Sequence, residues 1–341
     1  MATTASLTLS ALFKAAITRA GFARLSARTA GLTPTAKALA LAHAASSFSG
    51  VTVAIVPTDR DVDQMAADAQ FFLDALEGGH AGSSTVGVRP FPSHQVDPYR
   101  GMTPHFRVMS ARGRVLHAVA DHRVRLVVAS AAALLPRVSR PARLRQASVD
   151  LRSGSTIEPQ DLAELLIDAG FTREDPVDAH GEFTVRGGIV DIFPADEAKP
   201  VRLEFVGDMV ESLRRFDPDT QRSGDAVDQL VVSPVRERFD DEGVSFFQFL
   251  AESGSYQLFV SEPSEVVDVA GRTWEQARRS FETLRETATN APVRPPETLL
   301  AGEGDVLPLL AGASALDELA VDEGAHHVAC QPSMEYRGRI V

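Results

Sequence analysis

The chain of 341 residues is poor in cysteine, in tyrosine and tryptophan, and in long apolar runs. Its single cysteine, Cys330, excludes an internal disulfide framework and is typical of proteins that stay in a reducing cytosol. We therefore expect a cytoplasmic location. No run in the sequence approaches the roughly 20 apolar residues that a membrane-spanning helix needs, so no membrane association is expected.

Positive charge is also scarce. The chain has 34 lysines and arginines against 46 acidic residues, which gives a formal net charge of −12. Nucleic-acid-binding proteins usually carry a basic balance or a basic stripe, because they neutralise phosphates. The acidic balance therefore disfavours a broad DNA- or RNA-binding surface and leaves room only for a local basic patch. The length and the 44% hydrophobic content indicate a soluble globular protein of two or three domains.

Two short apolar runs, residues 51–57 and 124–130, are rich in β-branched side chains and predict strands buried on both faces. Helical periodicity predicts helices over residues 61–77 and 106–120. Strands that alternate with helices are typical of a parallel sheet. The first part of the chain, residues 1–143, is therefore predicted to be α/β.

A basic connector that contains proline, at residues 137–145, predicts a domain boundary. A helix predicted over residues 159–169 and a run of short alternating strands follow it, and together they predict a small α+β domain over residues 144–230. The α/β pattern then returns over residues 231–341. The expected elements there are helices at 244–252 and 273–286 and strands at 256–261 and 327–330.

The most informative stretch runs from residue 181 to residue 223, where apolar and polar residues alternate between turn-forming residues. In one predicted strand, parity places Val201, Leu203 and Phe205 on one side and Arg202, Glu204 and Val206 on the other. Parity likewise places Arg186 and Thr184 opposite Phe183 and Val185. We therefore expect Arg202 to have a side chain that is free for a partner. A sheet with one buried face and one arginine-bearing face indicates a docking surface and not a catalytic cleft.

The same stretch, HGEF-x-x-RGGIVDIFP followed by VRLEF-x-x-D-x-x-ESLR-x-FD-x-x-TQRS, resembles the UvrA-binding module shared by UvrB and the bacterial transcription-repair coupling factors. Residues 91–112 and the closing CQPSMEYRGRIV, residues 330–341, resemble the coupling factors. UvrB has a tyrosine-rich hairpin that clamps DNA where this chain has residues 91–112. The chain is therefore identified by resemblance with the N-terminal, UvrB-like region of the coupling factors.

The resemblance implies an α/β domain with a degenerate phosphate loop, split by an inserted antiparallel-sheet domain. It implies that the chain binds UvrA, and it places Arg186, Arg202 and Val206 at the family's contact positions. The family often has an aromatic residue where this chain has Val206. Guanidinium groups suit protein docking because they pair with carboxylates in two-point contacts.

The sequence ends at Val341 without a helix cap or tail signal, so we expect the chain to be one part of a longer protein. In the family, polymerase-binding and ATP-driven translocase domains follow this region. RNA polymerase, DNA, ATP and magnesium are therefore expected as partners and cofactors of those domains. A C-terminal domain is expected to mask the UvrA-docking face in the resting protein.

The segment GLTPTAKA, which starts at Gly31, lies where a phosphate-binding loop would lie in an α/β domain. The working motif needs a second glycine and a hydroxyl that holds magnesium, and here Ala36 and Ala38 stand at those positions. Pro34 also removes one backbone donor. Only Gly31 and Lys37 of the motif remain, so we expect no nucleotide cofactor and no enzymatic activity in this chain.

Other polar clusters give weaker signals. Adjacent histidines on a strand point to opposite faces, so His326, His327 and Cys330 are not expected to hold a metal ion. No nucleophile or paired carboxylate lies near the other candidate histidines in sequence, so no catalytic residue is expected among His94, His105 and His180. His180 is expected to contact the backbone of the following strand. The remaining arginines of the docking module are expected on a solvated surface, and they are Arg214, Arg215 and Arg222.

Two alternative functions remain open. A DNA-binding subunit of the UvrB type would need the aromatic hairpin and a basic surface. A nucleotide-dependent enzyme would need a complete phosphate loop and a second carboxylate motif that binds magnesium. A pull-down of UvrA with the purified chain is the most informative single test of the docking function.

Overall fold

The computed structural model describes residues 8–22, 27–77, 86–195, 197–239, 242–287, 293–319 and 324–330. The chain divides into two compact units. The parallel-sheet unit comprises Met1–Ser93, His122–Pro136 and Gly254–Val341, and the antiparallel-sheet unit comprises His94–Asp121 and Arg137–Ser253.

The parallel-sheet unit is built on seven strands in the order β15-β1-β14-β13-β2-β4-β3, and every neighbouring pair is parallel. Every residue of β2 is buried, as a strand covered on both faces requires. The strands are β1 (Arg28–Ala30), β2 (Val51–Val56), β3 (Val86–Phe91), β4 (Val124–Ser130), β13 (Tyr256–Ser261), β14 (Ser314–Leu316) and β15 (His326–His327).

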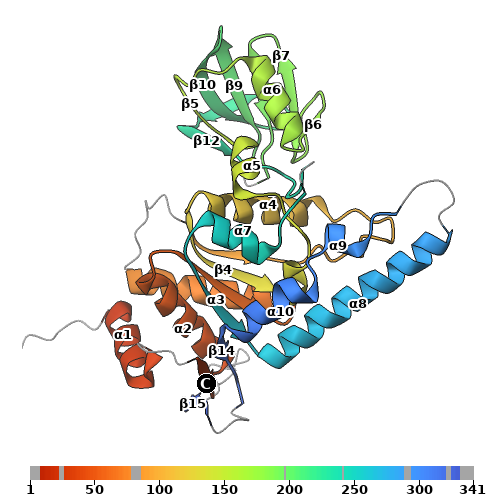
Figure 1. Cartoon of the computed structure of the whole chain (residues 1–341). Helices are drawn as coiled ribbons and strands as arrows, with labels where there is room; N and C mark the ends of the chain where they lie inside the picture. Colours follow the sequence, from red (N-terminus) through yellow and green to blue (C-terminus); the bar gives the residue numbers. More distant parts are fainter. Residues whose placement is uncertain are drawn as a thin grey trace, which may run out of the picture. The chain divides into compact units, whose positions relative to one another are not determined.

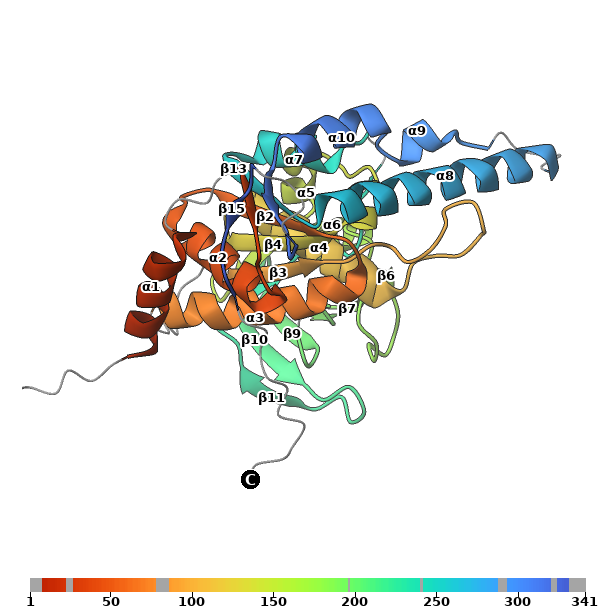
Figure 2. The same cartoon turned by 90° about the horizontal axis from the view of Figure 1, so that it is seen from below.

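Helices cover both faces of this sheet. On one face, side chains of α1, α2 and α3 pack with Ala54, Val56, Leu126 and Val128 of the central strands in one apolar core. Figure 2 shows α2 and α3 on one side of these strands and α8 with α10 on the other. The helical segments are α1 (Leu9–Ala20), α2 (Pro34–Ser47), α3 (Asp59–Glu77), η2 (Ala131–Leu134), α8 (Pro263–Thr287), α9 (Pro296–Leu299) and α10 (Glu303–Ala311).

The antiparallel-sheet unit contains a six-stranded sheet in the order β11-β10-β9-β8-β7-β6 and a two-stranded sheet of β12 and β5. Its neighbouring strands are antiparallel except for the edge pair of β6 and β7, which is parallel. The strands are β5 (Val149–Arg152), β6 (Thr172–Arg173), β7 (Glu182–Arg186), β8 (Ile189–Ile192), β9 (Val201–Val206), β10 (Met209–Phe216), β11 (Ser223–Ala226) and β12 (Gln229–Val232).

One face of the six-stranded sheet forms the core of this unit together with α6 (Pro159–Asp168), which lies against the strands in Figure 1. Leu162 and Leu166 of α6 pack in the same apolar cluster as Phe183, Val190 and Leu203 of the sheet. Pro159 starts the helix at a position where its missing N–H costs nothing. The other helices of the unit are α4 (Phe106–Ala120), α5 (Pro141–Gln146) and α7 (Phe246–Ser253).

The α/β class with a parallel sheet, and the separate antiparallel sheet, are confirmed. The predicted helix at 106–120 and the strands at 124–130, 201–206 and 256–261 have the expected bounds. The helix predicted from residue 273 begins ten residues earlier, at Pro263, because its first turns bury Val266 and Ala270. The basic connector contains the short helix α5.

The domain boundaries at residues 144 and 230, and the insertion of one domain into the other, stay predictions. Most of the closing stretch that resembles the coupling factors, residues 331–341, lies outside the described residues. None of the helices in the described part of the chain is long and apolar enough to cross a bilayer.

Candidate functional site

The face of the six-stranded sheet that points away from α6 carries the arginines that the sequence indicated. Strand pairing places Asp191 of β8 opposite Arg202 of β9, and Arg202 opposite Arg214 of β10. Thr184 of β7 pairs with Asp191 from the other side. These four residues form one transverse row, and we call the surface around it the outer face.

Asp191 is the fixed point of the outer face, because its side chain is completely buried. Arg202 donates to it at two points, from Nε to Oδ1 at 2.7 Å and from Nη2 to Oδ2 at 2.8 Å. Arg186 donates from Nη2 to the same Oδ2 at 2.6 Å. A buried carboxylate is stable only when it is paired, so two guanidinium groups are held on the outer face by one aspartate.

The surroundings of Arg202 correct one expectation from the sequence. The residue lies on the outer face as parity requires, but its side chain is only 14% exposed and is not free. Besides Asp191 it contacts the carbonyl oxygen of Gln221 at 3.2 Å, and its guanidinium lies 4.7 Å from the ring centroid of Phe216. The hydrogen bonds that Arg202 donates to Asp191 raise the pKa of the Arg202 guanidinium, although burial opposes this. Arg202 therefore stabilises the sheet through its ion pair with Asp191 and also places a charge at the surface.

Part of the outer face is itself covered. Val177, Phe193 and Phe216 form a small second apolar cluster there, and each is at least nine-tenths buried. Thr184 lies on the outer face, as its parity predicts. It is only 4% exposed, because this part of the outer face is covered. The open part of the outer face is therefore the end that carries Arg186.

Arg186 has the more accessible of the two guanidinium groups, with 42% of its side chain exposed. Its second ion pair, from Nη1 to Asp175 at 3.1 Å, joins two exposed side chains. Such bridges in water contribute little, so a partner carboxylate can replace Asp175 at small cost. Val206 lies at the end of the same face and is 58% exposed.

The remaining arginines of the module have separate environments. Arg214 is exposed and donates weakly to the carbonyl oxygen of Gly224 at 3.4 Å. Arg215 pairs with Glu197 at 2.9 Å, and Arg222 is exposed. Sequence reasoning missed Asp191, although an aspartate inside the apolar run IVDIF is a signal, because a charge in a buried strand needs a partner.

The phosphate-loop segment has an internal partner for its lysine. Lys37 of α2 is only 3% exposed, and its ammonium forms an ion pair with Glu262 and a 2.9 Å hydrogen bond with Ser261 Oγ. Both partners lie at the end of β13. The ammonium of Lys37 is therefore paired within the chain.

The backbone conformation and the close neighbours of Gly31 explain why a glycine stands at this position. Its φ is +81°, and a Cβ at this position would lie 2.2 Å from the carbonyl oxygen of Val328. The same Cβ would lie 3.1 Å from Cε1 and Nε2 of His327, which is closer than ordinary van der Waals contact. The glycine at the start of the loop thus permits the close approach of the segment after β15.

A buried ionic cluster, which the sequence did not indicate, holds α4 in the antiparallel-sheet unit. Arg112 is completely buried and donates from Nε to Glu237 at 2.6 Å, and His94 Nε2 lies 2.5 Å from the other carboxylate oxygen. Burial alone would raise the pKa of Glu237, but the charges and hydrogen bonds of Arg112 and His94 lower it to about 2. Arg112, the last residue of the stretch 91–112 that resembles the coupling factors, is therefore a core residue.

The other histidines have structural contacts. His105 accepts from the backbone N–H of Arg107 and caps α4. His180 lies 3.9 Å from the ring of Phe193 and contacts the carbonyl oxygen of Glu197, not the backbone of the following strand. Among the described residues no group of three His, Cys, Asp or Glu side chains is placed to hold a metal ion.

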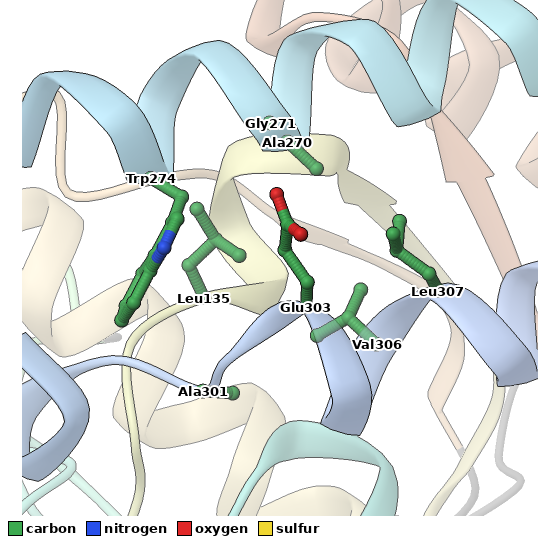
Figure 3. A pocket seen from close by; sticks show the side chains of 8 residues that line it. All are labelled: Leu135, Ala270, Gly271, Trp274, Ala301, Glu303, Val306 and Leu307. Carbon is green, nitrogen blue, oxygen red and sulfur yellow. The ribbon is translucent and has the colours of Figure 1, made fainter.

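A small cavity lies in the parallel-sheet unit beside α8 and α10. Figure 3 shows its lining, with the carboxylate of Glu303 among the side chains of Trp274, Leu135 and Leu307. Its volume of about 10 Å³ is enough for roughly one water molecule. This cavity cannot hold a nucleotide or another small-molecule substrate of that size.

Comparison with known proteins found a matching domain family and several similar proteins. Residues 149–237 match the UvrB interaction domain family. The chain is 33% identical over 211 residues to the transcription-repair-coupling factor of Myxococcus xanthus, which is 62% of this chain and 17% of that protein. It is 29% identical over 216 residues to that of Haemophilus influenzae, which is 63% of this chain and 18% of that protein.

The coupling factor of Escherichia coli is 27% identical over 238 residues, which is 70% of this chain and 19% of that protein. The matched region thus spans less than a fifth of the length of these relatives. The outer face, with Asp191, Arg186 and Arg202, lies inside the region that matches the domain family. Residues 149–237 thus match the UvrB interaction domain family, and 62–70% of the chain is similar to part of the transcription-repair-coupling factors.

Proposed function

We propose that this chain binds UvrA through the outer face and thereby recruits nucleotide-excision repair to a stalled RNA polymerase. The observation that carries the proposal is the pair of guanidinium groups held by one buried carboxylate, Asp191, inside a UvrB interaction domain. Arginine side chains that are already positioned lose little conformational entropy on binding. The outer face is suited to a partner that offers carboxylates.

Arg186 is the principal contact in this proposal, and Arg202 has two roles. Arg186 is the more exposed and gives up only a solvent-exposed ion pair with Asp175. Arg202 holds Asp191 and contributes the edge of its guanidinium to the surface. Val206 completes the contact as an exposed apolar residue at the end of β9.

We also propose that the chain itself neither binds ATP nor catalyses a reaction. The support is the ion pair of Lys37 with Glu262, together with Pro34, which lacks a backbone donor at the start of α2. In this proposal, other parts of the whole protein carry out ATP hydrolysis, DNA translocation and polymerase binding. A C-terminal domain of the whole protein masks the outer face.

The direct test is a titration of purified UvrA into the purified chain by isothermal calorimetry, with gel filtration of the mixture. We expect a one-to-one complex. Matched titrations with double-stranded DNA test the UvrB-type alternative, which predicts DNA binding in addition to UvrA binding. Absence of any complex with UvrA at micromolar concentrations would reject the proposed function.

A further inference from the structure

The hairpin of β9 and β10 presents two apolar side chains to solvent at its tip. Val206 and Met209 are directly paired across the two strands, on either side of the Gly207-Asp208 turn. Val206 is 58% exposed and Met209 is 45% exposed. Cross-strand partners have Cβ atoms about 5 Å apart, so the two side chains form one continuous apolar surface. We call this pair the hairpin-tip patch.

Strand parity places the hairpin-tip patch on the outer face. Val206 is two residues beyond Glu204 and four beyond Arg202 on the same strand, and Met209 shares its side because the two are paired. Glu204 in turn pairs with Ile189, which follows the turn after Arg186. The patch is therefore continuous with the charged part of the outer face.

Open space adjoins the hairpin-tip patch on the side of two glycine turns. A Cβ placed on Gly207, in the turn between the two strands, would have no heavy atom within 4 Å, and the same holds for Gly187 in the neighbouring hairpin. On the other side, Met209 is bridged to Thr156, which is itself exposed. Two glycine turns thus leave open space on this edge of the sheet, into which a partner's side chains can reach.

We propose that Val206 and Met209 together are the apolar anchor of the UvrA contact, with Met209 supplying the larger part. The inference rests on the proposed function and adds a contact residue, Met209, to it. An apolar anchor beside desolvated arginines is the usual composition of a binding hot spot. Met is unbranched and adaptable, so it fills an apolar hollow that the shorter valine does not reach.

The size of the patch favours a larger partner over self-association through the patch alone. A stable interface buries about 800 Å² on each side, far more than two side chains supply. The hairpin-tip patch therefore contributes to an interface only together with the rest of the outer face. The partner surface must offer an apolar hollow next to carboxylates that meet Arg186.

The test compares UvrA binding of the whole chain with that of Val206→Ser, Met209→Ser and the double variant. Ile167→Ser is the matched control, since Ile167 is 55% exposed in the same unit but lies on α6, on the opposite side of the sheet. We expect Met209→Ser to weaken binding about tenfold and Ile167→Ser to have an effect below about twofold. All melting temperatures should stay near that of the parent, because the replaced side chains are exposed.

A rescue variant sharpens the test. If the anchor works through apolar area, Val206→Phe in the Met209→Ser background should recover most of the lost affinity. If Met209→Ser and Val206→Ser bind UvrA like the parent while Arg186→Ala binds UvrA more weakly, the proposed apolar anchor is wrong. That result leaves the proposed function standing. If the parent itself does not bind UvrA, the proposed function and the anchor fail together. A dimer of the parent that Met209→Ser abolishes would instead assign the patch to a second copy of the chain.

Discussion

The guanidinium of Arg202 and the carboxylate of Asp191 form a two-point ion pair between adjacent strands β9 and β8, with distances of 2.7 and 2.8 Å. Asp191 has no solvent exposure, whereas Arg202 keeps one edge at the surface. The same contact thus stabilises the sheet and positions a charge for a partner. Effects of substitution at Arg202 must therefore be separated into folding and binding.

Arg202→Ala is expected to destabilise the antiparallel-sheet unit, because it leaves Asp191 buried with only Arg186 as a charged partner. Breaking a buried pair from one side typically costs about 3–5 kcal/mol. Urea unfolding measures this loss. In a double-mutant cycle, Asp191→Ala and Arg202→Ala should show a coupling of about 2 kcal/mol. The exposed Arg272→Ala on α8 is the control, and a loss no larger than this control would contradict the structural role.

Arg186→Ala should separate binding from folding. Asp191 keeps its two-point contact with Arg202 in this variant, so we expect the melting temperature to fall by only a few degrees. Loss of a desolvated interfacial arginine costs about 2–5 kcal/mol, so UvrA binding should weaken at least about tenfold. Calorimetry with UvrA and thermal melts test both parts. Parent-like affinity would remove Arg186 from the interface.

The buried cluster of Arg112, Glu237 and His94 predicts a specific response to acid. The pKa of Glu237 is about 2 in the folded chain against an ordinary value of 4.5, so the unfolded chain binds this proton first as the pH falls. The stabilisation is complete above about pH 4.5 and is lost progressively toward pH 2. Glu237→Gln should unfold more easily at neutral pH and show a smaller loss of stability between pH 5 and pH 3. Equal acid dependence in the parent and the variant would contradict the assignment.

Titration of the chain with magnesium-ATP is expected to give no heat of binding. The Lys37 ammonium is engaged by Glu262 and Ser261, and binding of a phosphate would have to replace those contacts without the backbone donor that Pro34 lacks. Lys37→Ala should lower the stability to urea, as expected for a buried, paired lysine, and should not change the ATP titration. A sub-millimolar isotherm for the parent would overturn this prediction.

The fragment of residues 144–230 is expected to be less stable than one of residues 144–239. Val232 and Val235 belong to the same apolar core as α6, and the N–H of Val235 donates to the carbonyl oxygen of Ala169 at 3.0 Å. The shorter fragment loses both side chains and two residues of β12. Circular dichroism melts of the two fragments test the difference. A longer fragment that does not melt cooperatively would contradict independent folding.

The sequence by itself determined the elements and the faces of the strands. Period-two alternation in residues 201–206 placed Leu203 inside and Arg202 and Val206 outside, because successive side chains of a strand must point to opposite faces. The mainly apolar, β-branched runs in β2 and β4 similarly indicated strands of a parallel sheet covered on both sides. These patterns depend only on local geometry and on the burial of apolar area.

Only the tertiary structure decided which charges find each other. Lys37 and Glu262 are 225 residues apart, and Arg112 and Glu237 are 125 residues apart. No local pattern encodes such pairs, since they depend on which strand ends and helices pack together. Asp191 is a further example, because it is buried and pairs with two arginines. The side chain of Arg202, which we expected to be free, is therefore part of an ion pair between strands. A charge that leaves water must find a partner, and the fold determines which one.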